Sequence, residues 1–298
     1  MYNLRPLLAL LPIAAICPIA PAQQRPAITG VAHIALKTSD LGAASRFYGH
    51  DLGFDTPFTA EGATWFKIND HQYIAVTPDL KTDTEDRLSH IAFETADARA
   101  LRAYLAGRGI AVPAALAPDA DSNLTLVVKD PEGHEIRFVQ YLPGSLHSRS
   151  FGKSLPETRI SQRMIHVGFT VHDRAAEDAF YRDILGFDEM WHGGKTDTSV
   201  DWVDMRVPDG SDWLEYMLNV RNPSPKTLGV MHHLALGAPS VADAYNRLLE
   251  RGVTPTEKPK IGRDGKWQLN LYDPDLTRVE LMEPAPVQTP CCSPMKTR

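Results

Sequence analysis

The 298-residue chain contains very little cysteine. Cys17 lies in the apolar N-terminal stretch, and Cys291 and Cys292 are adjacent near the C-terminus. The long segment between them therefore cannot be a disulfide scaffold. Adjacent cysteines rarely bridge each other because the geometry is strained. A disulfide formed by Cys291 or Cys292 would therefore link two chains as a homodimer. We expect the proline-containing tail, residues 285–298, to be disordered.

The chain also lacks an excess of basic residues. Its 31 lysines and arginines are outnumbered by 37 acidic residues, and no long basic run occurs. This argues against nucleic acid as a partner, because nucleic acid requires a cationic face. The hydrophobic share of 43% and the charged share of 23% are instead typical of a soluble globular protein, with enough length for two domains.

A long hydrophobic run is missing as well. The apolar stretch at residues 7–20 is interrupted by two prolines and is too short for a comfortable membrane span. Arg5 precedes the stretch and small residues end it at Ala22, which is the pattern of a secretory signal peptide. We predict that residues 1–22 are removed and that the mature protein is periplasmic or secreted, without a membrane contact. A retained N-terminal anchor is the alternative.

The sequence does contain an internal repeat. The segment from His33 to Asp40 recurs from His166 to Asp173 at an offset of 133 residues. Further along the offset is 143, which predicts about ten extra residues in the second copy, between Phe187 and Pro208. Fixed offsets of this kind indicate repeated structural units.

Each copy consists of two smaller units with the same order of elements. An alternating strand opens each unit, a helix follows, and a glycine turn leads into further strands. These strands begin at His33, His90, His166 and His233. The pattern predicts an α+β fold of four β-α-β-β-β modules in two tandem domains, at residues 28–142 and 160–284. A linker with glycines, prolines and serines lies between them.

This arrangement resembles the vicinal oxygen chelate superfamily, which includes glyoxalase I, extradiol dioxygenases, fosfomycin-resistance proteins, methylmalonyl-CoA epimerase and bleomycin-resistance proteins. The resemblance rests on residues 166–171, 180–187, 232–236 and 273–281. It implies that the two modules of a domain form a cup into which metal ligands project from four strands. The superfamily performs many reactions on one scaffold, so the resemblance predicts the fold better than the reaction.

In the second domain the resemblance implies that the ligands are His166, Glu215, His233 and Glu280. Imidazoles and carboxylates suit Zn, Ni, Mn or Fe(II) and leave positions open for substrate oxygens. Strand alternation lets only one of His232 and His233 face the cup, and the repeat selects His233. A lone histidine in a strand is usually structural, but four ligand-type residues at four matched positions favour a metal site.

The first domain lacks the full set. The same offsets lead to His33, Gln72, His90 and Arg137, and an arginine at the last position would repel a dication. Glu135 lies on the same strand face, so a shifted three-ligand site is the alternative. We favour a degenerate cup that is kept for packing or for binding an anion.

The ligand set favours a glyoxalase-like lyase or isomerase, in which Glu215 or Glu280 is also the catalytic base for a small oxygen-chelating substrate. An Fe(II) extradiol dioxygenase on His166, His233 and Glu280 is an alternative. That class normally carries a histidine and a tyrosine shortly before the last glutamate, whereas only Tyr272 occurs near that place. A binding protein without metal, as among the bleomycin-resistance relatives, is a second alternative.

Substrate contacts are expected from Arg263, Lys266 and Tyr272. The first two follow a glycine in a loop and suit an anionic substrate, although a solvated loop face would have the same composition. The insertion that contains Trp191 could cover the cup as a lid, since glycine-rich loops move easily, or could simply connect two strands.

Overall fold

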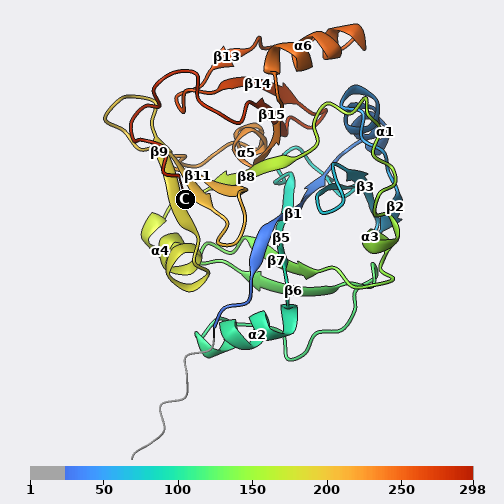
Figure 1. Cartoon of the computed structure of the whole chain (residues 1–298), viewed down its shortest axis with the longest axis vertical. Helices are drawn as coiled ribbons and strands as arrows, with labels where there is room; N and C mark the ends of the chain where they lie inside the picture. The colour runs from blue at the N-terminus through green and yellow to red at the C-terminus, as the bar shows by residue number, and fades with distance from the viewer. Residues whose placement is uncertain (1–23, 298) are drawn as a thin grey trace, which may run out of the picture.

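The computed structural model describes residues 24–297 (Figure 1). The predicted signal peptide, residues 1–22, lies outside the described residues. Within residues 24–297, every helix is too short or too polar to cross a membrane.

The first domain is a seven-stranded sheet in the order β2-β3-β4-β1-β5-β7-β6. β1 pairs in parallel with β4 of its own module and antiparallel with β5 of the next, so the two modules form one curved sheet. The second module has a single bridge, between Pro118 and Leu124, in place of one strand. The strands are β1 (Ile28–Lys37), β2 (Phe58–Ala60), β3 (Ala63–Lys67), β4 (Tyr73–Thr77), β5 (Leu88–Thr95), β6 (Leu124–Lys129) and β7 (Glu135–Gln140).

The second domain repeats this plan in eight strands, in the order β13-β14-β15-β12-β8-β11-β10-β9. β8 and β12 pair antiparallel at its centre, β11 runs parallel to β8, and β15 runs parallel to β12. The predicted α+β fold of four modules is confirmed. The strands are β8 (Met164–Thr170), β9 (Asp188–Gly193), β10 (Trp202–Arg206), β11 (Trp213–Met217), β12 (His233–Gly237), β13 (Lys260–Ile261), β14 (Trp267–Tyr272) and β15 (Arg278–Met282).

The helices begin at polar caps that the sequence places there. Asp40 and Asp173 each accept a hydrogen bond from the backbone three residues on, and both helices continue into a π-helical turn. The helical segments are α1 (Leu41–Ser45), η1 (Arg46–Asp51), α2 (Ala98–Gly107), α3 (Leu146–Arg149), α4 (Arg174–Asp178), η2 (Ala179–Ile184), α5 (Pro225–Met231) and α6 (Val241–Glu250).

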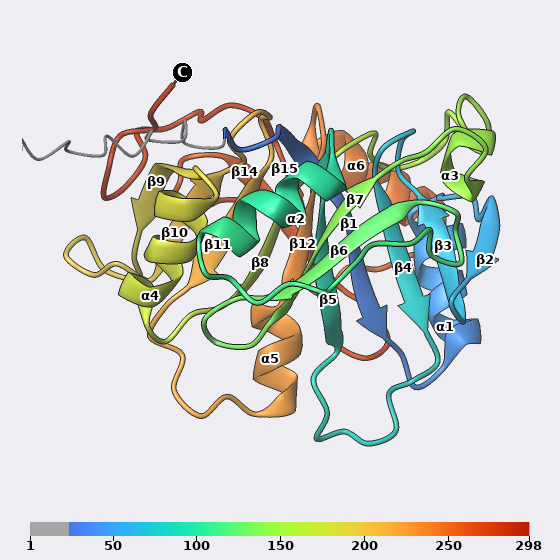
Figure 2. The ribbon, with the colours of Figure 1, turned by 90° about the horizontal axis from the view of Figure 1, so that it is seen from below.

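The two domains lie side by side (Figure 2), and their buried side chains form one hydrophobic core. The rings of Phe93 and Phe187 meet across the interface at 5.2 Å, and Tyr104 donates a hydrogen bond to the carbonyl of Ile184 at 2.7 Å. These contacts make the two domains one packed body rather than two independent units joined by a linker.

The strand register corrects one predicted correspondence between the domains. Tyr73 pairs with His33 of β1, and Trp213 pairs with His166 of β8. The offset between the equivalent strands β4 and β11 is therefore 140 residues. Ala75, and not Gln72, therefore corresponds to Glu215. The prediction failed because the extra residues of the second copy do not all precede β11: three of them lie between β11 and β12, the connection that contains α5.

The C-terminal segment 285–297, for which the sequence predicts disorder, makes hydrogen bonds to the second domain in this structure. Cys291 donates its backbone N–H to the carbonyl of Arg263 at 2.8 Å, and Lys296 donates to the carbonyl of Met190 at 2.8 Å. Figure 1 shows the C-terminus beside β9, the edge strand, whose open backbone groups give the tail its partners. Cys291 and Cys292 are bonded to each other in this segment.

Candidate metal centre

Three of the four predicted ligands meet at the floor of the second cup. His166 on β8 and His233 on β12 face each other with their Nε2 atoms 3.1 Å apart. Oε2 of Glu215 on β11 lies 2.9 Å from Nε2 of His233 and 3.8 Å from Nε2 of His166. The group is compact enough to hold one ion. It forms because β8 lies between β11 and β12, so that one face of all three strands lines the cup.

Glu280 approaches the same group from β15. Its Oε2 atom lies 3.7 Å from Nε2 of His166, and the side chain is buried. Burial raises the pKa of Glu280 to about 7, while the nearby Arg278 acts in the opposite direction. This carboxylate is therefore adjacent to the compact group, although it is not one of its three members.

Both histidines are in the form that binds metals. Burial lowers the pKa of His166 and of His233 well below the usual value, so each ring is neutral. Nδ1 of His233 lies 2.8 Å from the carbonyl of Met231. A neutral ring that donates from Nδ1 presents the lone pair of Nε2 to the cup, which is how a neighbouring carbonyl usually orients a metal-binding imidazole. Two neutral imidazoles and two carboxylates thus fit a divalent cation.

His232 points away from this group. Its Nδ1 atom pairs with Asp86 of the first domain at 2.9 Å, and its Nε2 atom lies 3.0 Å from the hydroxyl of Thr170. The choice of His233 as the residue that faces the cup agrees with this placement.

A cavity of about 310 Å³ opens above the group. It is lined by residues that sequence reasoning missed, namely Asp204, Asn270 and Arg278. Asp204 lies directly across from Glu215 in the β10–β11 pair, and Asn270 lies across from Glu280 in the β14–β15 pair. Burial, and next the charge of Glu215, raise the pKa of Asp204 well above its usual value. Cross-strand pairing with the ligands was the signal that could have found Asp204 and Asn270, once the register was known.

The predicted substrate contacts are only partly at the cavity. Arg263 lines it, but its guanidinium already pairs with Asp197 at 2.5 Å. Lys266 is buried outside the lining, with its ammonium 4.7 Å from the centre of a Trp213 ring. Tyr272 donates its hydroxyl proton to Glu257 at 2.7 Å and is likewise outside the lining.

The expected lid is instead the edge strand β9. Trp191 lies within β9, lines the cavity and is only 4% exposed. Its indole N–H donates to the carbonyl of Cys291 at 3.0 Å, so the C-terminal tail holds it in place.

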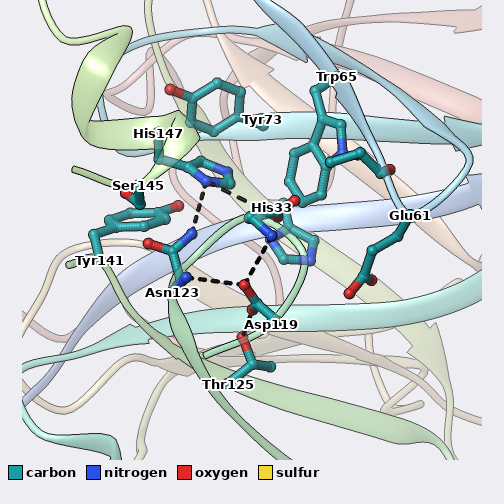
Figure 3. Close-up of polar contacts among 12 residues, drawn as sticks. His33, Glu61, Trp65, Tyr73, Asp119, Asn123, Thr125, Tyr141, Ser145 and His147 are labelled. Atoms are coloured by element: carbon teal, nitrogen blue, oxygen red, sulfur yellow. Dashed lines mark hydrogen bonds and ion pairs between the residues drawn. The ribbon is translucent and has the colours of Figure 1, made fainter. Parts of the chain in front are cut away.

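The first cup is filled by the protein itself (Figure 3). His33 and His90 face each other with Nε2 atoms 2.9 Å apart. Helix α3 of the linker inserts His147 against the rings of Trp65 and Tyr73, with ring centres 4.9 and 4.7 Å apart. Among residues 24–297, the three groups that could hold an ion all lie outside this cup.

The positively charged residue of the first cup is neutralised locally. Arg137 occupies the position that corresponds to Glu280 and donates to Glu135 at 2.8 Å. Glu135 lies 3.9 Å from the nearest ring nitrogen of His90. The alternative three-ligand site would therefore have to compete with this arginine for its carboxylate.

Comparisons with known proteins agree with the architecture. Residues 30–138 and 163–281 match the model of the Glyoxalase/Bleomycin resistance protein/Dioxygenase superfamily. No curated protein sequence matches the chain.

Among solved structures, homoprotocatechuate 2,3-dioxygenase from Arthrobacter globiformis is similar at a TM-score of 0.66 and 16% identity, covering 88% of this chain and 82% of that one. The Mn(II)-bound glyoxalase from Novosphingobium aromaticivorans gives 0.66 and 16%, with 87% and 83% covered. The 2,3-dioxygenase LapB from Pseudomonas sp. KL28 gives 0.67 and 16%, with 90% and 98% covered. At these identities the similarity shows a shared fold.

Proposed function

Because the chain belongs to the Glyoxalase/Bleomycin resistance protein/Dioxygenase superfamily, we propose that it is an enzyme that uses one divalent metal ion. The ion would be held by His166, Glu215, His233 and Glu280. The observation that carries this proposal is the buried contact among both imidazoles and the Glu215 carboxylate, with Glu280 at 3.7 Å. A bound divalent ion would supply Lewis acidity toward two neighbouring oxygens of a small substrate.

The reaction class that the donor set supports first is proton transfer by a lyase or isomerase. The donor set brings two carboxylates, Glu215 and Glu280, to the cavity lining, and a carboxylate beside the substrate can take a proton from carbon and return it elsewhere. Glu280 suits this role at its Oε2 atom, because it lines the cavity and lies 3.7 Å from Nε2 of His166, farther from the histidine pair than Glu215. Trp191 and the other cavity walls would exclude water from the proton transfer.

Ring cleavage of a catechol by an Fe(II) form is the second candidate. His166, His233 and one carboxylate make the two-histidine, one-carboxylate set that suits Fe(II) oxygenases. The similar structures support this candidate more than the first, since two of the three described above are dioxygenases. The cavity lining argues against ring cleavage, because the extra histidine and tyrosine of the extradiol class are not in place. His166 is the only histidine of the lining, and Tyr272 lies outside it and is bonded to Glu257.

The metal content of the purified chain tests the proposal. We expect about one ion per chain after dialysis against each divalent metal, and loss of that ion in His233→Ala and Glu215→Ala. His90→Ala, which removes the matching histidine of the first cup, should keep it. A wild-type chain that binds no ion would contradict the enzyme proposal and favour a metal-independent binding protein.

The loaded protein then separates the two reaction classes. Oxygen uptake with catechols by the Fe(II) form would support ring cleavage. Exchange of carbon-bound hydrogen for deuterium in hydroxyketones, followed by NMR without oxygen uptake, would support the lyase or isomerase class.

A further inference from the structure

Within the described part of the chain, one cation of the second cup has a nearby carboxylate but no carboxylate at hydrogen-bond distance. Arg278 on β15 lines the cavity, and its side chain is only 15% exposed. Among residues 24–297 its Nε atom is buried without a hydrogen-bond partner. Its nearest carboxylate oxygen, Oε2 of Glu215, lies 3.9 Å from Nη2, beyond hydrogen-bond distance. A guanidinium has five N–H donors, and leaving them unpaired away from water is costly.

The first cup shows what a satisfied arginine looks like at this place in the fold. There the two strand positions are exchanged: Glu135 corresponds to Arg278, and Arg137 corresponds to Glu280. Arg137 donates to Glu135 at 2.8 Å and lies 3.4 Å from a carboxylate oxygen of Glu61. The arginine of the second cup lacks both of these contacts.

The other arginine at the cavity is already committed. Arg263 donates to the carbonyl of Gly194 at 3.0 Å and pairs with Asp197 at 2.5 Å. Of the two, only Arg278 keeps its guanidinium donors available on the side of the metal group.

We infer that Arg278 binds an anionic oxyacid group of the substrate, a carboxylate or a phosphate. The planar guanidinium matches both groups with two parallel hydrogen bonds. The substrate class would then be small molecules that carry an acid group in addition to the two oxygens facing the metal ligands. This inference rests on the proposed function, because it places the acid group beside His166 and Glu280 in the same cavity.

Matched probes test the acid group. The Mn(II)-loaded protein is titrated with catechol and 3,4-dihydroxybenzoate for the carboxylate arm, and with dihydroxyacetone and its phosphate for the phosphate arm. Binding is followed by tryptophan fluorescence, since Trp191 and Trp202 line the cavity. We expect the acidic member of at least one pair to bind about 10- to 100-fold more tightly than the neutral member, because hydrogen bonds to a charged group usually contribute that much. The arm that shows the difference identifies the group.

Two substitutions examine the role of the arginine. Arg278→Gln should remove the preference for the acidic probe and leave the affinity for the neutral probe within about twofold. Arg278→Lys keeps the charge and should retain part of the preference. Lys258→Gln removes an exposed cation of the second domain that is outside the cavity lining, and it should leave the preference unchanged.

The inference fails if the wild type binds both members of each pair equally, or if Arg278→Gln keeps the preference. It also fails if Lys258→Gln abolishes the preference as fully, because the effect would then be general electrostatics. Metal content is measured in every sample. A wild type without bound metal contradicts the proposed function, whereas a metal-loaded wild type without a preference contradicts this inference alone.

Discussion

At the scale of single residues, the two cups differ by their carboxylates rather than by their histidines. His33 and His90 face each other much as His166 and His233 do, at 2.9 and 3.1 Å. Burial lowers the pKa of all four, so each ring is neutral in both cups. Neutral imidazoles alone bring no charge to oppose a dication. We conclude that the carboxylates decide which cup can hold an ion.

Changing one residue of the first cup tests this conclusion. Arg137→Glu replaces a cation by a carboxylate at the position that corresponds to Glu280. We expect the variant to bind a second, weaker ion, measured as the metal-to-protein ratio after dialysis against Mn(II). Arg137→Gln removes the cation without adding a ligand and should keep the wild-type ratio. Equal ratios for both variants would show that the filled cup cannot admit an ion.

A buried carboxylate between the domains makes stability depend on pH. Glu177 is fully buried, and burial, followed by the charge of Asp130, raises its pKa to about 8. The folded state therefore holds a proton that the unfolded state releases near pH 4.5. Stability contributed by this group is present at low pH and is lost as the pH rises from about 4.5 through about 8.

Glu177→Gln should remove this loss. We expect the variant to exceed the wild type at pH 8 by about 2 kcal/mol, or roughly 4–8 °C in melting temperature, and to match it at pH 5. Thermal melts at both pH values provide the measurement. Glu250→Gln, at an exposed carboxylate, is the control and should show no such difference. An equal gain at both pH values would contradict the assigned cause.

At the scale of elements, β9 contributes Trp191 to one wall of the second cavity, and the tail packs against this wall. The tail bonds to β9 through Lys296 and to the loop before β14 through Cys291. The carbonyl of Cys291 also receives the indole N–H of Trp191. Both backbone and side-chain hydrogen bonds therefore hold the tail along an edge strand.

Removal of residues 285–298 should expose this wall. We expect acrylamide to quench the fluorescence of Trp191 more strongly in the truncated chain, because its hydrogen bond to the tail is lost. A double serine variant at Cys291 and Cys292 keeps the backbone bonds and should retain the wild-type quenching. If truncation leaves the quenching unchanged, the tail does not hold the tryptophan.

At the scale of the whole molecule, the shared core predicts that both domains unfold together. Phe187 from the second domain packs against Phe93 of the first. Phe187→Ala should lower the free energy of unfolding by about 3–5 kcal/mol. Trp65 is the only tryptophan of the first domain, so fluorescence of a chain that keeps only Trp65, compared with circular dichroism, reports whether the transitions coincide. Two separate transitions in the wild type would contradict the prediction.

The fold could be predicted because it depends on local patterns that occur twice in the repeat, and the Asp caps marked the helices. The resemblance to a known superfamily supplied the candidate metal ligands, and strand alternation with the repeat chose His233 over His232. The substitution of Arg137 for a glutamate was equally visible. Such features follow from the period of a strand or the start of a helix, which a short stretch of sequence defines.

Contacts between distant segments could not be predicted in this way, since strand pairing rather than spacing fixes them. The pairing of β11 with β8 made Ala75, and not Gln72, the counterpart of Glu215. Helix α3 fills the first cup, and the tail holds Trp191 at the second. Among residues 24–297, Nε of Arg278 has no hydrogen-bond partner, and this depends on where every neighbouring side chain lies. Local sequence patterns thus specify the modules and suggest the candidate ligands, whereas long-range packing fixes which polar groups already have partners.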